Sequence, residues 1–167
     1  LFRQTEADMI ATMRRAAGDG PAGELLNGLF GPERRLYKRF AQYSAFEVPD
    51  QYAGLTRRPY SWLVVCAENL AALLQREWGQ EVHAHEVLLD APPLQREVQF
   101  DVEIHFPKTG GFYPLPDVSP VVRTLAREQF DDYVKRVRVF VHPRLQSQLG
   151  RVRDRDALVR EAAAMSG

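Results

Sequence analysis

Cysteine is almost absent from this sequence, which contains only Cys66 among its 167 residues. A single cysteine excludes an internal disulfide, and no pair of cysteines or histidines has the spacing of a zinc site. Cys66 lies in an apolar run, so we predict a buried, small hydrophobic side chain rather than a nucleophile. This cysteine usage is typical of a reducing compartment, and we expect the protein to be cytoplasmic.

Recognisable catalytic motifs are also missing. None of the four histidines is followed by aspartate, and the sequence has neither a Gly-x-x-x-x-Gly-Lys-Ser/Thr phosphate loop nor a Gly-x-Ser-x-Gly nucleophile elbow. His105 falls on the polar face of a predicted strand and His142 at the end of another, so both are predicted to be surface residues. We therefore expect no catalytic residue, metal or cofactor in this chain.

Neither an excess of one charge nor a long apolar run is present. Lys plus Arg and Asp plus Glu both number 22, so the formal net charge is zero and no global field favours nucleic acid or an acidic membrane. The longest apolar segment, residues 62–74, is interrupted by Glu68 and Asn69 and is shorter than the roughly 20 residues that span a bilayer. We expect no membrane segment and no signal peptide.

The first half of the chain has mostly helical patterns. Thr5 and Asp8 have the spacing of a capping box at the start of a helix over residues 5–17. Further helices are predicted over residues 22–30 and, most strongly, over Tyr60–Trp78, where apolar residues recur at helical spacing and Gly79 is placed to end the helix. Residues 34–43 are predicted to form a strand, and residues 48–54 have the composition of a turn. The apolar positions of the long helix are Leu63, Cys66, Ala67, Leu70, Leu73 and Leu74.

Strand patterns dominate the second half. Residues 98–106 alternate strictly between apolar and polar side chains, and Gly110-Gly111 predicts a hairpin turn into a strand over residues 112–115. Ser119 and Pro120 predict the start of a helix through about residue 130. We also predict a strand over residues 137–141 and a last helix to about residue 165, capped by Asp154 or Asp156. The expected fold is α+β, with helices followed by a small antiparallel sheet packed against the long central helix.

The chain is organised around a stretch that combines basic and aromatic residues. It reads Arg34-Arg35-Leu36-Tyr37-Lys38-Arg39-Phe40. In a strand, Arg34 and Lys38 would share one face with Cα atoms about 13 Å apart, a distance over which two basic side chains can close around a phosphorylated ligand. The alternative is an ordinary solvated face of a surface strand. Lys108 is predicted at the end of the later hairpin.

Four stretches in this order resemble the segment that follows the catalytic core of HD-domain phosphohydrolases. The most similar subgroup is that of the SAM-and-HD-domain dNTP triphosphohydrolase and its bacterial relatives. The stretches are Arg-x-Leu-Tyr-Lys at residues 34–38 after the helix ending at 24–29, then residues 98–106, 119–122 and 137–143.

The resemblance implies an accessory role for this chain. It implies one accessory domain over residues 1–167, whose helical segment 1–31 continues from an HD core that precedes Leu1 and holds a divalent metal. In that subgroup the region packs on the HD core, helps to assemble the oligomer and contributes basic residues to a nucleotide effector site between subunits. Arg34 and Lys38 match two of these residues, and Lys108 matches a third with looser spacing. The expected partners are the HD core, further copies of the chain and a nucleotide.

Two other functions remain open from the residues alone. A module for single-stranded nucleic acid would use Arg35 and Arg39 as cations and Tyr37, Phe40 and Tyr43 as stacking groups. The balanced net charge disfavours this alternative. The third possibility is an independent small enzyme.

Overall fold

The computed structural model describes residues 5–92, 102–124 and 135–167. Its main body, which we define as residues 38–92 and 135–167, contains a three-stranded antiparallel sheet in the order β1-β5-β2, with β5 in the middle. The predicted α+β class is confirmed. The strands of this sheet are β1 (Lys38–Tyr43), β2 (Val87–Asp90) and β5 (Val137–Val141).

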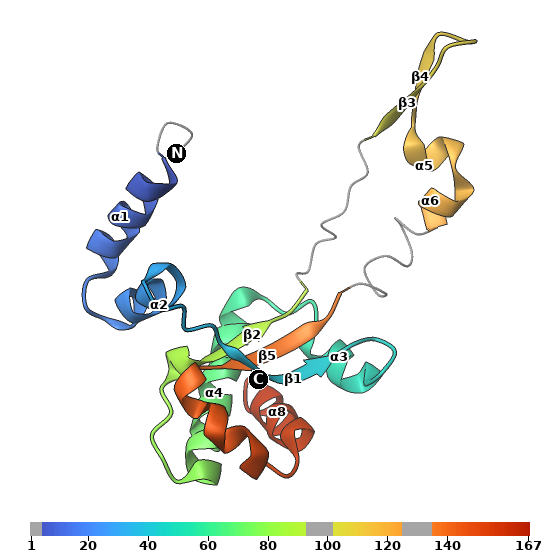
Figure 1. Ribbon diagram of the computed structural model, residues 1–167. Helices are drawn as coiled ribbons and strands as arrows, with labels where there is room; N and C mark the ends of the chain where they lie inside the picture. Colours follow the sequence, from blue (N-terminus) through green and yellow to red (C-terminus); the bar gives the residue numbers. More distant parts are fainter. Residues whose placement is uncertain (1–4, 93–101, 125–134) are drawn as a thin grey trace.

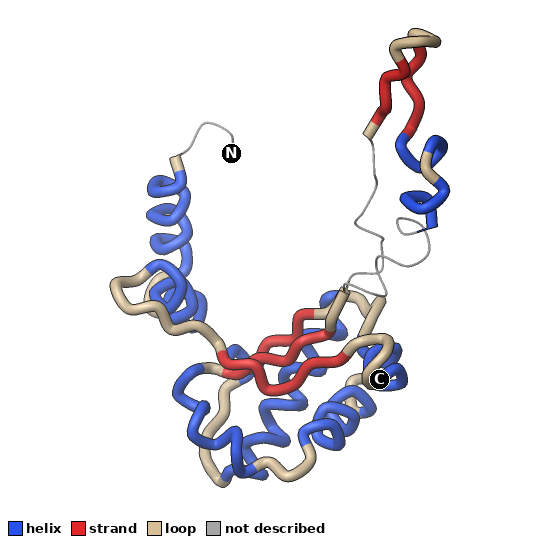
Figure 2. The backbone as a smooth tube through the Cα atoms, turned by 45° about the vertical axis from the view of Figure 1, so that its right-hand side comes forward, coloured by secondary structure: helices blue, strands red, loops and turns tan. Residues whose placement is uncertain are grey.

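Helices supply the rest of the main body, and α4 and α8 lie on the same side of the sheet (Figures 1 and 2). The predicted capping box at Thr5 and Asp8 is confirmed, and so are the bounds of the long helix. The helices described outside residues 102–124 are α1 (Glu6–Ala17), α2 (Pro21–Phe30), α3 (Pro49–Leu55), α4 (Tyr60–Trp78), α8 (Arg155–Ala164) and the 3-10 helices η1 (Ala84–Glu86) and η3 (Pro143–Arg151).

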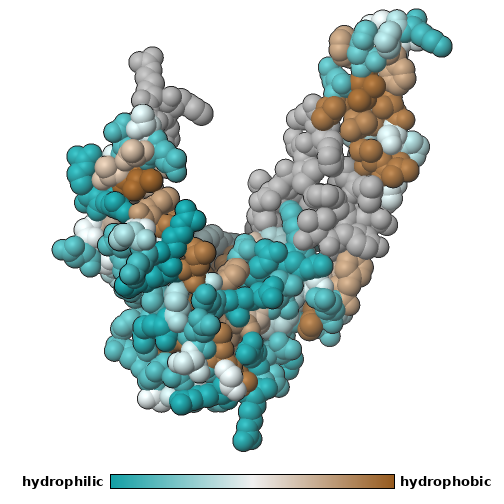
Figure 3. Space-filling view, in the orientation of Figure 1, coloured by the Kyte–Doolittle hydropathy of each residue, from teal (hydrophilic) through white to brown (hydrophobic). Residues whose placement is uncertain are grey.

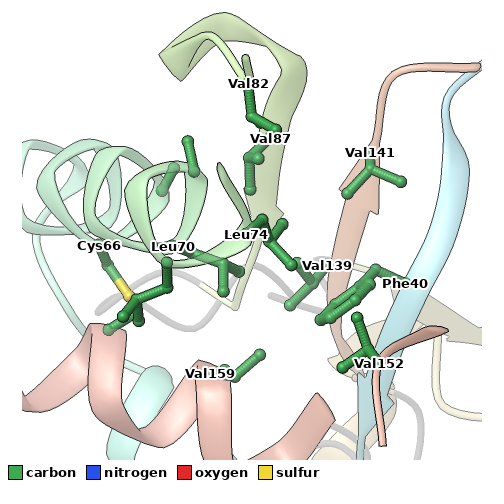
Figure 4. Packing of buried hydrophobic residues seen from close by; sticks show 14 of the residues in the cluster. Phe40, Cys66, Leu70, Leu74, Val82, Val87, Val139, Val141, Val152 and Val159 are labelled. Atoms are coloured by element: carbon green, nitrogen blue, oxygen red, sulfur yellow. The ribbon is translucent and has the colours of Figure 1, made fainter. Parts of the chain in front are cut away.

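The core lies between the sheet and the helices α4 and α8 (Figure 4). Alternate residues of β5 face it, which is why Val137, Val139 and Val141 are fully buried while Arg138 and Phe140 lie on the opposite face. Burying one such side chain contributes about 1.5–3 kcal/mol to folding. Cys66 is buried among them, as predicted. The residues with almost no exposed surface include Phe40, Tyr43, Leu70, Leu74, Val87, Leu145 and Val159.

A β-bulge interrupts the alternation of β1. The register shifts between Arg39 and Ala41, so Phe40 is the extra residue and both Phe40 and Ala41 pack against the core. Arg39 and Gln42 then lie on the open face, where Arg39 donates a hydrogen bond of 3.0 Å to Gln42. The bulge therefore brings Phe40 into the core and leaves the cations of the strand outside it.

The predicted strand start at Arg34 is wrong, because β1 begins at Lys38. Lys38 pairs with Val141, the last residue of β5. After β5 the chain turns at Pro143 into η3. No partner strand is left for residues 34–37. Their backbone bonds elsewhere, since the Arg35 N–H donates to the Gly28 carbonyl at 2.8 Å.

The turn predicted over residues 48–54 is also wrong, because this segment forms α3. Pro49 occupies the first turn of that helix, where its missing N–H costs nothing. Gln51, Tyr52 and Leu55 are buried, so tertiary packing stabilises a helix that its composition did not indicate.

A separate hairpin unit comprises residues 102–124 and lies apart from the three-stranded sheet in Figure 1. The predicted turn is confirmed, with Gly110 at φ 67° and its N–H donating to the Phe106 carbonyl at 2.8 Å. Leu115 begins a helix rather than ending the strand. Residues 98–101 of the predicted strand and 125–130 of the predicted helix lie outside the described residues. The unit contains β3 (Glu103–Phe106), β4 (Gly111–Pro114), α5 (Leu115–Val118) and α6 (Pro120–Thr124).

Gly79 ends α4 in the left-handed region, at φ 63° and ψ 26°. Replacing it with alanine is expected to destabilise the chain by about 1 kcal/mol, because an alanine Cβ is strained at this φ although no atom lies within 4 Å. Gly54→Ala in α3 is the control, since its Cβ also meets open space without a positive φ. Urea unfolding measures both changes, and equal stabilities for the two variants would contradict the assignment.

Candidate functional site

The basic segment, residues 34–39, joins α2 to the main body and contains two of the predicted phosphate contacts. Arg34 lies before the strand and Lys38 is its first residue, and both side chains are exposed. Neither side chain forms a hydrogen bond or ion pair with another described residue. The predicted common strand face is wrong, but both cations remain accessible to a ligand.

Lys108, the third predicted contact, lies in the turn between β3 and β4. Its side chain is exposed and has no ion-pair partner among the described residues. Within the described residues, no hydrogen bond or ion pair brings it together with Arg34 or Lys38. The two stretches that link the hairpin unit to the main body lie outside the described residues.

Tyr37 anchors the basic segment to the main body. Its hydroxyl donates to the His85 carbonyl at 2.7 Å. Its ring meets the His142 ring edge-on, with ring centroids 5.5 Å apart. Burial, followed by the charges of Glu86 and Glu24, raises the pKa of Tyr37 to about 12. The phenol therefore stays protonated at neutral pH and remains a hydrogen-bond donor.

Beneath Tyr37, Glu86 and Arg144 form a bidentate ion pair. Glu86 is only 1% exposed, and its carboxylate accepts hydrogen bonds from two guanidinium nitrogens and from the His83 N–H. Arg144 also donates to the Glu81 carbonyl at 2.8 Å. Burial opposes ionisation, but the hydrogen bonds of Arg144 and His83 and the nearby positive charges hold the pKa of Glu86 below its usual value.

His142 packs against this ion pair and is 7% exposed, so its predicted surface position is wrong. Its backbone N–H donates to the Glu86 carbonyl at 2.8 Å, and its Nδ1 accepts from the Arg144 N–H at 3.3 Å. Burial is the main cause that lowers the pKa of His142, while the carboxylates of Glu86 and Glu24 oppose this shift.

Sequence reasoning missed this polar cluster, which we define as Glu24, Tyr37, His85, Glu86, His142 and Arg144. Glu86 and Arg144 are 58 positions apart, so no spacing rule joins them. The one sequence feature that points to this cluster is Pro143, which bends the chain directly after β5. His142 and Arg144, on either side of it, then contact Glu86 of η1. The identity of the partners depends on the fold.

Neither a metal centre nor a membrane helix is found in the described part of the chain. No three of its histidine, cysteine, aspartate or glutamate side chains are placed to bind a metal ion. None of its helices combines the length and apolar character that a membrane span requires.

Two of the three stacking groups of the nucleic-acid alternative are not available to bases. Phe40 and Tyr43 are each 1% exposed, and the Tyr43 hydroxyl donates to Asp156 at 3.0 Å. The prediction that these rings stack on bases is wrong, because the bulge and the strand alternation direct both into the core.

Comparison with known proteins identifies the class. Residues 1–161 match the model of the HD associated region, and the chain belongs to this family. It is thus an accessory region of HD-domain proteins, and the predicted resemblance to such proteins is confirmed. No curated protein and no solved structure matches the chain. Nucleotide specificity and the extent of the domain stay predictions.

Arg144→Gln is expected to destabilise the chain by about 2–4 kcal/mol, because it leaves a buried Glu86 carboxylate without its partner. Glu86→Gln should cost about 1–2 kcal/mol, since Arg144 can still reach water, and the double variant should recover part of the loss. Urea unfolding at neutral pH measures the cycle.

The control for this cycle is Arg76→Gln, which breaks the exposed pair of Arg76 and Glu161 at 3.8 Å. It should cost less than about 0.5 kcal/mol. Similar losses for Arg144→Gln and Arg76→Gln would show that the buried pair contributes no more than a surface pair.

Proposed function

We propose that this chain is a non-catalytic C-terminal accessory domain of a cytoplasmic HD-family nucleoside triphosphate phosphohydrolase. In this proposal it supports oligomer assembly and binds the phosphates of an effector nucleotide. The divalent metal and the hydrolysis belong to an HD core of the same protein. The observation that carries the proposal is a pair of unpaired, exposed cations, Arg34 and Lys38, on either side of the anchored Tyr37.

The chemistry of the two cations suits a triphosphate. The arginine offers a planar fork of donors, and the lysine adds a compact charge that can contact a second phosphate. Anchoring of Tyr37 restrains the backbone between them, which lowers the entropic cost of binding. Two contacts without a base-binding pocket supply only about −4 kcal/mol, a millimolar affinity.

Lys108 supplies the third contact in this proposal, either from the same chain or from a neighbouring copy. Its hairpin unit has no buried residue, and apolar side chains gather on its surface (Figure 3). Such a surface favours coverage by another protein surface, which supports a role in assembly. The exposed apolar residues of the unit are Val102, Phe106, Phe112, Tyr113, Val118 and Val121.

Replacing both Arg34 and Lys38 with alanine in the intact HD protein should abolish nucleotide-driven assembly or activation. Stability should change by no more than about 0.5 kcal/mol, because both side chains are exposed and unpaired. Light scattering and phosphate release, each with and without nucleotide, measure the effect. The control is the double alanine variant of Arg151 and Arg153, two cations that are also exposed.

This experiment separates a phosphate-binding role of the basic segment from a purely structural role. Normal activation of the Arg34 and Lys38 double variant would overturn the phosphate-binding role. Normal activation together with early melting would make the basic segment purely structural.

The first helix supports the proposed contact with an HD core. None of the residues of α1 is buried, although Met9, Ile10 and Met13 form an apolar stripe. An amphipathic helix without a buried face contributes little to its own domain and is typical of an interface.

Without its partner, this chain is expected to self-associate or to bind a hydrophobic dye through that stripe. Replacing Met9 and Met13 with lysine should lower both signals, because the apolar surface of the stripe is lost. Light scattering and dye fluorescence measure the effect. Ala11→Lys, on the opposite side of α1, is the control, and a monomeric chain that binds no dye would count against the interface.

A further inference from the structure

Glu24 of α2 faces two imidazoles of the main body. Its Oε2 lies 3.6 Å from His85 Nε2, and its Oε1 lies 3.7 Å from His142 Nε2. These distances are too long for good hydrogen bonds but short enough for an ion pair with a protonated imidazole. The buried His85 Nε2 has no hydrogen-bond partner among the described residues. While both rings are neutral, the contact is therefore not an ion pair.

Apolar packing does little to hold α2 in this position. Gly23 is the buried residue of this helix, and it has no side chain to contribute to a core. The helix leads directly into the basic segment, where Arg35 bonds to the carbonyl of Gly28. A change at Glu24 therefore acts on both α2 and the start of the basic segment.

We propose that Glu24, His85 and His142 form a proton-dependent latch, which holds α2 against the main body more firmly when an imidazole is protonated. This inference concerns the docking of α2 and does not depend on nucleotide binding.

The charges around both rings decide the direction of the effect. His142 is attracted by Glu24 and Glu86 and repelled by Arg144 and His85, while Tyr37 meets its ring without a charge. Because Arg144 already neutralises Glu86, Glu24 is the carboxylate left to respond to a new charge. His85 faces Glu24 on one side and stacks on His83, with ring centroids 5.5 Å apart.

Docking of α2 and global folding respond to protons with opposite signs. Burial lowers the pKa of His142 below its usual 6.5, so the unfolded chain takes up a proton more readily and global stability falls as pH drops below about 6.5. The Glu24 carboxylate lies beside the imidazoles only when α2 is docked, and there it favours the protonated ring. By linkage, the same proton shifts α2 toward that docked state.

The experiment is nuclear magnetic resonance of this chain, comparing the native sequence with Glu24→Gln. The imidazole titration midpoint of His142 is expected to fall by about 0.5–1 pH unit in the variant, because an opposite charge has been removed. In the native chain, amide protection of α2, corrected for intrinsic exchange, should rise about 3- to 10-fold between about pH 7.5 and 5.5. In the variant it should not rise.

Glu33→Gln is the matched control. Glu33 is exposed, follows α2 and forms no ion pair with a described residue, so its variant should titrate and exchange like the native chain. An unchanged His142 midpoint in Glu24→Gln would overturn the latch. Loss of α2 protection on acidification of the native chain would overturn it as well.

Discussion

A carboxylate that is almost completely buried must be neutralised where it lies, and Glu86 is such a carboxylate. Arg144 neutralises it from η3, and the Glu86 backbone carbonyl accepts the N–H of His142. These bonds join η1 to the end of β5. The Tyr37 contacts with His85 and His142 depend on that junction, so the position of the basic segment follows from one ion pair.

In this arrangement the aromatic residue of the basic segment is held in place, while its cations are exposed to solvent. The residue that holds the basic segment, Tyr37, is half-buried and hydrogen-bonded, whereas its cationic neighbours Arg34 and Lys38 are exposed and make no ion pair with described residues. An ion pair with a buried carboxylate, such as that of Glu86 and Arg144, adds little net stability compared with an apolar pair, but it defines where the chain segments meet. Preorganisation of a backbone around accessible cations is what a phosphate contact requires.

Much of the fold could be predicted from the sequence because local rules apply to its long or regular elements. The capping box of α1, the apolar positions of α4 and the alternation of β5 each depend on residues close together in the chain. The helix over Pro49–Leu55 could not, because its buried side chains stabilise it only within the folded domain. The bulge at Phe40 is similar, since pairing with β5 defines the extra residue.

Less of the candidate site than of the fold could be predicted from the sequence. Arg34 and Lys38 belong to one short stretch and stay predicted phosphate contacts, but the common strand face predicted for them is prevented by the end of β5. The histidines were judged by their positions on strands, which says nothing about Glu24 or Arg144 arriving from distant segments. Long-range charge pairs have no period, and only the three-dimensional structure reveals them.

The hairpin unit imposes a different constraint, because none of its described residues, 102–124, is buried. An isolated two-stranded hairpin is marginally stable in water. Rings do pair across the strands, His105 with Phe112 and Phe106 with Tyr113, yet Phe106, Phe112 and Tyr113 remain exposed on their outer sides. Coverage by a further surface would stabilise the unit and fix Lys108 at the same time. Assembly and completion of a phosphate site that uses Lys108 would then be a single event, because the same contact supplies both.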